Sequence, residues 1–171
     1  FVVTEEEKIK FKKKYFLNEK PIIYLGNAQV KKGVIQSYEE LKNLDVTFVT
    51  SGKSQIKLPC LNLNISYRDY LILLSVSDIV LTMSRFLEGW NRTAHEATLL
   101  CTTVIGSGKG GMKELLEKSN QIVCPEFKNL KSAVLDVLLE NNNRKLDKHF
   151  ISRLNLEKFK NNWLKIFLDD K

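Results

Sequence analysis

Residues 77–116 constrain the fold more than any other stretch of the chain. An apolar run, Ile79–Met83, predicts a buried strand, and a helical pattern follows over 92–100. A second strand is predicted at 103–105, and a glycine-rich loop then leads into a helix that begins at Met112. Strand, loop and helix in this repeating order are typical of a parallel α/β sheet, whose ligand lies beyond the carboxyl ends of the strands.

The alternation of strands and helices extends along the rest of the chain. Further strands are predicted over 21–25, 46–49, 60–65 and 121–124. Helices are predicted within the polar lead-in 1–20 and over 34–42, 67–76, 130–139 and 150–168, with a polar turn at 141–143. No repeat or low-complexity linker interrupts the pattern. We therefore predict a single domain over 1–171 of α/β class: a parallel sheet of about six strands with helices on both faces.

The residues that follow the first predicted strand suit an anionic ligand. That strand ends at Gly26 and Asn27, and Lys32 and Gly33 precede the next predicted helix. The backbone N–H groups and the dipole at the start of a helix attract an anion, and a lysine adds charge. The alternative is an ordinary surface loop that happens to carry lysines.

Two glutamates are the candidates for chemistry. Glu88 is predicted in a loop and Glu96 on the helix that follows it. A carboxylate pair can act as general acid and base, or can accept hydrogen bonds from sugar hydroxyls. The alternative is that Glu88 is a plain loop residue and that Glu96 lies on the helix surface, paired with Arg92 one turn earlier.

Backbone groups near these glutamates could also bind a ligand. Gly89–Thr93 leads into a helix whose first N–H groups are available for a phosphate. Gly110 and Gly111 precede the next helix and let the backbone approach a ligand closely. His95 and His149 lack partners at metal-ligand spacing, so no metal site is predicted.

Four segments, in this order, resemble the group 1 retaining glycosyltransferases of family 4. Glu88–Trp90 stands for the Glu-Gly-Phe of that family, and Glu96 follows Glu88 at the spacing of its E-x7-E signature. The other matching segments are His95–Ala97, Val104–Ile105 and Gly110–Glu114. The resemblance implies a Rossmann-like domain, the C-terminal donor-binding lobe of a GT-B fold.

The resemblance also implies a role for each residue. Glu96 would bind the ribose of the donor, and Glu88 and Lys32, as the catalytic residues, would lie at the donor sugar and its diphosphate. Asn27 stands where the family has an arginine, so Arg92 would supply that charge instead. The residues expected to bind the donor are Gly26, Asn27, Gly89, Arg92, Thr93, Glu96, Gly110 and Gly111. The family uses no bound metal and no cofactor beside its nucleotide-sugar donor.

By this resemblance the complete enzyme would be a hexosyltransferase that moves a sugar from a nucleotide diphosphate to a hydroxyl acceptor with retention. The acceptor would be held by an N-terminal lobe that is missing from these 171 residues. The chain begins at Phe1 rather than Met, as expected for a piece of a longer chain, and we expect it to be inactive alone. The alternative is a non-catalytic nucleotide-binding subunit.

The net charge of +7 suits an anionic ligand. It also leaves open a nucleic-acid-binding domain that would use Lys12–Lys14. We do not expect nucleic acid as a partner, because no aromatic residues are interleaved with these lysines, as a single-strand binder would require. A solvated helix face is the simpler interpretation of the run.

Cysteine content and hydropathy bear on the compartment. Cys60, Cys101 and Cys124 are odd in number and lie in apolar surroundings, which predicts buried, reduced thiols in a cytoplasmic protein. The sequence has no apolar run of 18 residues, so no membrane span is expected. Peripheral association of the complete enzyme with a membrane stays open.

Overall fold

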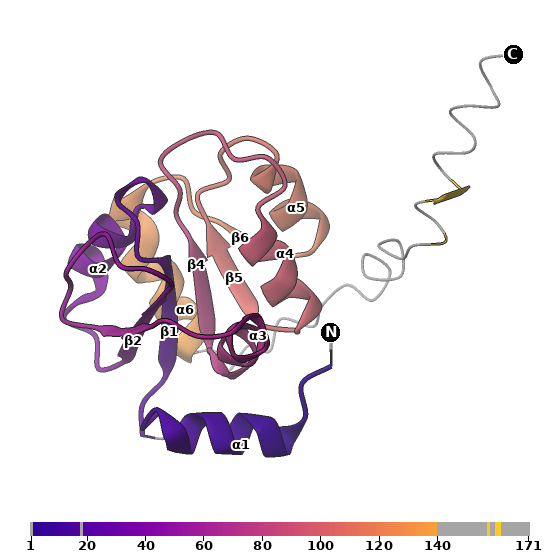
Figure 1. Cartoon of the computed structure of the whole chain (residues 1–171). Coiled ribbons are helices and arrows are strands. Elements are labelled where there is room, and N and C mark those ends of the chain that lie inside the picture. Colours follow the sequence, from indigo (N-terminus) through magenta and orange to yellow (C-terminus); the bar gives the residue numbers. More distant parts are fainter. Residues whose placement is uncertain (1, 18, 140–156, 158–159, 162–171) are drawn as a thin grey trace, which may run out of the picture.

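The computed structural model describes residues 2–17, 19–139, 157, 160 and 161. Six parallel strands form one sheet in the order β3-β2-β1-β4-β5-β6 (Figure 1). The strands are β1 (Ile22–Asn27), β2 (Thr47–Ser51), β3 (Leu61–Leu63), β4 (Ile79–Thr82), β5 (Thr103–Gly106) and β6 (Ile122–Val123). The α-helices are α1 (Glu5–Lys14), α2 (Val34–Leu41), α3 (Tyr67–Val76), α4 (Arg92–Leu99), α5 (Met112–Lys118) and α6 (Leu130–Leu139). Short 3-10 helices, η1 (Val30–Lys32) and η2 (Phe127–Asn129), precede α2 and α6. The predicted six-stranded α/β fold is confirmed.

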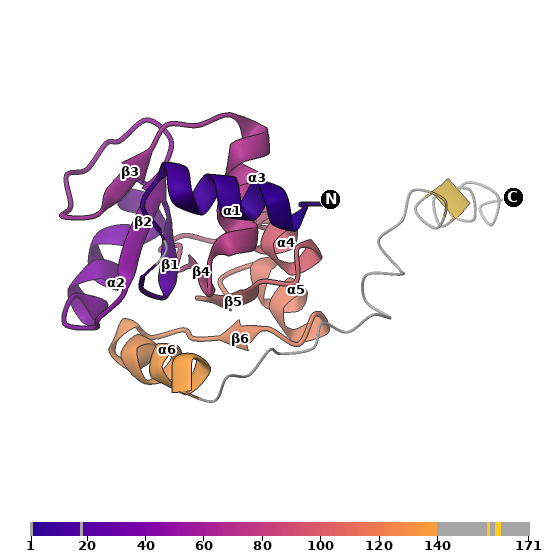
Figure 2. The same ribbon diagram turned by 90° about the horizontal axis from the view of Figure 1, so that it is seen from below.

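Helices cover both faces of the sheet. One apolar cluster joins α1, α3, α4 and α5 to one face, with Tyr24 of β1 and Val80 of β4 among its buried members. A second cluster joins α2 and α6 to the other face, where Ile23 and Ile79 point. Figure 2 shows α6 on the opposite side of the sheet from α1 and α3. Strands buried on both faces explain why they appear in the sequence as continuous apolar runs.

The amino ends of the two central strands are tied together. The backbone N–H of Ile22 donates to Oδ2 of Asp78 at 2.7 Å, and the N–H of Asp78 donates to the carbonyl of Ile22 at 2.9 Å. This double contact sets the register in which Ile23 lies beside Ile79. Because the register is fixed at the start of both strands, their carboxyl ends and the loops beyond them also adjoin.

The helix boundaries follow from local hydrogen bonds. Helix α3 covers the predicted range 67–76, and Ser66 caps it by accepting a hydrogen bond from the N–H of Asp69 at 3.1 Å. The strands predicted over 60–65 and 121–124 are present but shorter. The turn predicted at 141–143 lies outside the described residues, as does most of the helix predicted over 150–168.

The prediction of three buried thiols is wrong for one cysteine. Cys124 is buried and Cys60 is half-buried, whereas Cys101 is exposed. Cys101 follows the last turn of α4, where the chain adopts a φ of +62° and turns its side chain toward solvent. The interpretation of Lys12–Lys14 as a solvated face agrees with the structure, since Lys13 and Lys14 are exposed. No helix in the described part of the chain is both long and apolar enough to cross a bilayer.

Helix α1 is attached to α3 by a charged contact. Nη2 of Arg68 lies 2.6 Å from both carboxylate oxygens of Glu7, and Nε lies 3.0 Å from one of them. The carboxylate of Glu7 also accepts a hydrogen bond from the N–H of Thr4, which completes a capping box at the start of α1. The hydrogen bonds from Arg68 are the main reason that the pKa of Glu7 falls from its usual 4.5 to about 2.

This lowered pKa predicts an acid-dependent loss of stability. A carboxylate with a depressed pKa in the folded state stabilises the protein above its unfolded pKa and loses that contribution as the pH falls through the folded value. The difference in the free energy of unfolding between wild type and Glu7→Gln should therefore shrink from pH 4.5 to about 2. Urea titrations at several pH values measure it. In an Arg68→Met background the same comparison should vary less with pH, and equal pH dependence in both backgrounds would contradict the assignment.

Candidate functional site

The site lies where the order of the strands reverses. The chain runs from β1 outward through β2 to β3, and then returns to β4 on the other side of β1 and continues to β5 and β6. In open α/β sheets a crevice forms at such a reversal, beyond the carboxyl ends of the strands. The loops after β1, β4 and β5 gather at this edge, at the top of Figure 1. They carry most of the residues that the sequence singled out.

The turn before α2 is pressed against the end of β4. Gly33 has a φ of +70°, and a Cβ at this position would lie 2.1 Å from the carbonyl oxygen of Met83. Nearby, the N–H of Arg85 donates to the carbonyl of Lys31 at 3.1 Å. Only glycine fits this close approach, which explains why Gly33 follows Lys32 in the sequence. The same approach brings Lys32 to the loop that carries Glu88.

Lys32 and Glu88, the two predicted catalytic residues, contact each other directly. Nζ of Lys32 lies 2.5 Å from Oε1 of Glu88, and the hydroxyl of Ser84 donates to the same oxygen. The side chains of Lys32 and Glu88 are only 28% and 11% exposed, so this ion pair is partly shielded from water. Nζ of Lys32 also lies 5.1 Å from the centre of the Phe86 ring, a cation–π contact. The sequence analysis predicted the lysine and the glutamate but not the serine.

The backbone of Glu88 is held by the glycine loop after β5. The N–H of Gly111 donates to the carbonyl of Glu88 at 2.9 Å, and the N–H of Glu88 donates to the carbonyl of Lys109 at 3.3 Å. Gly110 has a φ of +69°, and a Cβ there would lie 2.1 Å from the Glu88 carbonyl oxygen. Gly111 approaches Gly89 less closely, since a Cβ there would lie 3.1 Å from the Gly89 carbonyl oxygen. The structure therefore brings together the two predicted motifs, and it shows that these glycines receive a neighbouring loop of the protein.

Glu96 lies on α4 and is 4% exposed. Its Oε1 accepts a hydrogen bond from the hydroxyl of Tyr67 at 2.8 Å and lies 3.6 Å from Nε of Arg92. Its Oε2 is buried and has no hydrogen-bond partner among the described residues. The alternative interpretation expected a surface residue paired with Arg92. The pairing with Arg92 is present, but Glu96 is buried and does not lie on the helix surface. A buried carboxylate with an oxygen to spare is a strong acceptor for a ligand hydroxyl.

A cavity of about 290 Å³ opens beside Glu96. It is lined by Tyr24, Asn27, Ser51, Gly52, Ile65, Tyr67, Tyr70, Arg92 and Thr93. Tyr67 and Tyr70 stack with their ring centres 6.2 Å apart, and the hydroxyl of Tyr70 donates to Thr93 at 2.9 Å. The hydrogen bond to Glu96 is the main reason that the pKa of Tyr67 is raised. The sequence analysis did not identify these tyrosines as site residues.

A second, smaller pocket continues from this cavity toward Lys32. Its lining includes Gly26, Asn27, Lys32, Ser84 and Thr93, and Asn27 and Thr93 line both spaces. Oδ1 of Asn27 is buried without a hydrogen-bond partner in the described part of the chain. The two pockets, of which the second holds only about 30 Å³, adjoin at Asn27 and Thr93 and define a path from the Tyr67 side, near Glu96, toward Lys32. An extended ligand with hydroxyls at one end and negative charge near the other would suit this path.

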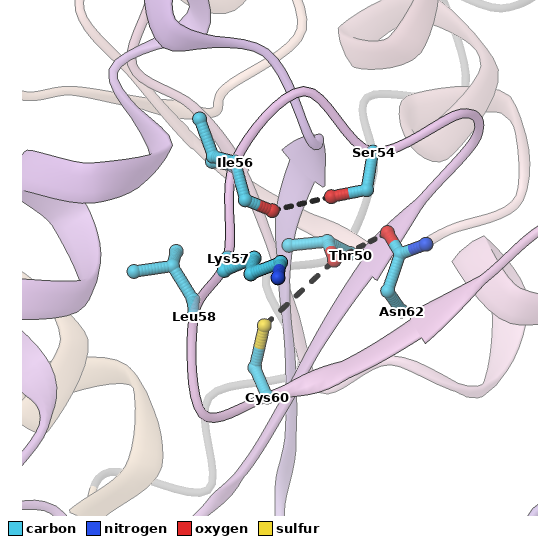
Figure 3. A pocket seen from close by; sticks show the side chains of 7 residues that line it. All are labelled: Thr50, Ser54, Ile56, Lys57, Leu58, Cys60 and Asn62. Carbon is cyan, nitrogen blue, oxygen red and sulfur yellow. Dashed lines mark hydrogen bonds between the residues drawn. The ribbon is translucent and has the colours of Figure 1, made fainter.

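Another cavity, of about 330 Å³, lies away from these residues. Figure 3 shows its lining side chains, Thr50, Ser54, Ile56, Lys57, Leu58, Cys60 and Asn62, which come from β2, β3 and the segment between them. The hydroxyl of Thr50 donates to Asn62 at 2.9 Å, and the thiol of Cys60 lies 3.7 Å from the same hydroxyl. Burial raises the pKa of Cys60. None of the predicted site residues lines this cavity.

The described residues contain no group of three or more His, Cys, Asp or Glu side chains that could hold a metal ion. His95 is instead placed beside Trp90, whose indole N–H donates to Nδ1 at 3.1 Å. Burial lowers the pKa of His95.

Comparison of the sequence with protein-family models finds no match, and comparison with curated proteins finds none of significance. The fold, however, is similar to solved glycosyltransferases. A glycosyltransferase from Rickettsia africae superposes with a TM-score of 0.77 at 19% identity, over 98% of this chain and 52% of that one. Anabaena Alr3699/HepE, in complex with UDP-glucose, gives a TM-score of 0.72 at 17% identity, over 82% and 45% of the two chains.

A single-domain structure is also similar. The C-terminal domain of LpcC, a group 1 family glycosyl transferase from Francisella tularensis, gives a TM-score of 0.63 at 18% identity, over 84% of this chain and 88% of that one. The present chain spans about half the length of the Rickettsia and Anabaena proteins. At these identities the likeness concerns the fold, which is the Rossmann-like α/β fold of a GT-B glycosyltransferase lobe.

The glycine loop gives a test of how the Glu88 loop is held. Gly110→Ala should lower the free energy of unfolding by about 1–3 kcal/mol, because the residue has a positive φ and its Cβ would collide with the Glu88 carbonyl. Gly89→Ala is the matched control, since nothing lies within 4 Å of a Cβ there. Chemical denaturation measures both variants. Equal stability of the two would show that the loop contact is not as tight as described.

Proposed function

We propose that this chain is the nucleotide-sugar-binding lobe of a retaining glycosyltransferase of the group 1, family 4 type. The observation that carries the proposal is the convergence of Lys32, Glu88 and Glu96 at one edge of the sheet. Lys32 is separated from Glu88 by 56 residues, whereas Glu96 follows Glu88 on α4. The resemblance gives a role to all three. The UDP-glucose in the Anabaena structure of similar fold supports the same ligand class.

Each part of the path suits one part of a nucleotide sugar. Glu96, with an oxygen to spare, would accept hydrogen bonds from the ribose, and Arg92 beside it carries a charge suited to phosphate. Lys32 would neutralise the charge that develops on the departing diphosphate, an electrostatic role that needs no covalent intermediate. The N–H groups at the start of α4, beside Thr93, would add to this effect. Glu88 would face the donor sugar.

The pairing of Lys32 with Glu88 refines these roles. A diphosphate that approaches Lys32 meets a lysine whose charge is already partly balanced by Glu88. Lys32 can serve both groups, because an ammonium has three N–H donors. The glutamate would in turn orient Lys32 between the sugar and the phosphate, with Ser84 fixing the carboxylate.

The complete enzyme would include a second lobe that holds a hydroxyl acceptor, since transfer requires both substrates to be oriented together. A non-catalytic nucleotide-binding subunit, which would use the same cavity beside Glu96, is the second candidate. Restoration of transfer when an N-terminal lobe is supplied distinguishes the enzyme from the subunit.

The proposal predicts nucleotide binding that depends on Glu96. Calorimetry with UDP, GDP, ADP and their sugars should detect at least one ligand, and Glu96→Ala should weaken it by about 1.5–3 kcal/mol, the range for a hydrogen bond to a charged group. Glu39→Ala, which removes an exposed carboxylate from α2, is the matched control and should bind as wild type does. Failure of all these ligands to bind at millimolar concentration would reject the proposal.

A second prediction separates a phosphate site from general basicity. Lys32→Ala should weaken binding of the preferred nucleoside diphosphate by about 1.5–3 kcal/mol, because a charge-assisted contact is lost. Lys13→Ala removes the same charge from the exposed face of α1 and should leave the affinity unchanged. Calorimetry at two salt concentrations measures both. Equal losses in the two variants would favour a diffuse basic surface over a defined site.

A further inference from the structure

Glu96 is covered on the side of the cavity. Tyr67 and Arg92 both line the cavity and both contact Oε1 of Glu96, whereas Glu96 is not among the lining residues. Oε2 is buried as well. A ligand hydroxyl is about as large as a water molecule, so it has little access to a carboxylate that is 4% exposed and whose Oε1 already accepts a hydrogen bond from Tyr67. A hydroxyl that binds Glu96 therefore requires Tyr67, Arg92 or both to move.

Tyr67 holds the carboxylate more firmly than Arg92 does. Its hydroxyl donates to Oε1 at 2.8 Å, a normal hydrogen-bond length, while the Nε of Arg92 is 3.6 Å away. A phenol O–H and a ribose O–H donate to a carboxylate in the same way. Tyr67 thus makes to Glu96 the contact that a sugar hydroxyl would make.

Tyr67 is also half exposed, which leaves its side chain room to turn toward solvent. The residue is 53% exposed at the first position of α3, whereas Tyr24 deeper in the cavity is 1% exposed. The cap at Ser66 fixes the backbone of α3, so a rotation of the Tyr67 side chain leaves the helix in place. The aromatic ring has only two side-chain torsions, and exposed side chains change rotamer readily.

We propose that Tyr67 sets the affinity and the ribose selectivity of the site, because its hydroxyl occupies the place of a ribose hydroxyl at Glu96 and is exchanged for it when a nucleotide binds. The inference rests on the proposed function. Binding then replaces one hydrogen bond to Oε1 and adds another to Oε2, which has no partner in the described part of the chain. The ribose hydroxyls therefore contribute less to the binding free energy than they would if Tyr67 did not already donate to Oε1.

The test compares Tyr67→Phe with wild type in the 171-residue chain. UDP, GDP and ADP are titrated by calorimetry, each beside its 2′,3′-dideoxy form. Tyr67→Phe keeps the ring but removes the competing hydroxyl, so the ribose form should bind about 10- to 30-fold more tightly, the lower part of the range for a hydrogen bond to a charged group. The dideoxy form, which has no hydroxyl for Glu96, should bind as it does to wild type.

Tyr38→Phe is the matched control, because Tyr38 lies on α2 with its ring against Phe48 and outside the cavity. This variant should bind the ribose form and the dideoxy form as wild type does. Suppose that wild type prefers the ribose form to the dideoxy form. Weaker or unchanged binding of the ribose form to Tyr67→Phe would then overturn the role of Tyr67 and leave the proposed function intact. Absence of any nucleotide binding by wild type would reject the proposed function itself, and this inference with it.

Discussion

The rest of the structure depends on how β1 pairs with β4, since these two strands adjoin where the order of the sheet reverses. Asp78 ties their amino ends through both its side chain and its backbone. At the opposite ends the backbone of Gly33 lies against the carbonyl of Met83. Because the two strands are tied at their amino ends and their loops touch at the carboxyl ends, these loops have little freedom to separate. The ion pair between Lys32 and Glu88 is a consequence of this backbone arrangement, and it is held further by Ser84.

The sequence was sufficient to predict the elements because each has a local cause. Strands buried on both faces appear as short apolar runs, and the residue that begins α3 is determined by a cap one residue earlier. The motif at Glu88 and the glycine loop were identified in a different way, through their resemblance to segments of the group 1 glycosyltransferases. Cys101 was misjudged because its apolar neighbours are helical, while its own backbone turns outward.

Contacts between distant side chains could not be predicted. Lys32 and Glu88 are separated by 56 residues, and Tyr67 and Glu96 by 29. No spacing rule connects such pairs, because their meeting depends on strand register, helix rotation and side-chain torsions together. The burial of Glu96 is a further example: its helical position suggested an exposed pair with Arg92, and only the packing of α3 against α4 places it inside. Position in the sequence thus identified the acidic residues, and packing determined their surroundings.

The exposure of Cys101 has a practical consequence for measurement. A thiol reacts with an alkylating reagent as the thiolate, so a raised pKa and burial both slow the reaction. Burial raises the pKa of Cys60 and Cys124, whereas Cys101 is exposed just beyond the helix that carries Arg92 and Glu96. A maleimide fluorophore should therefore attach first to Cys101. The chain thus carries a natural labelling position, from which a dye can report movements of α4 without any introduced cysteine.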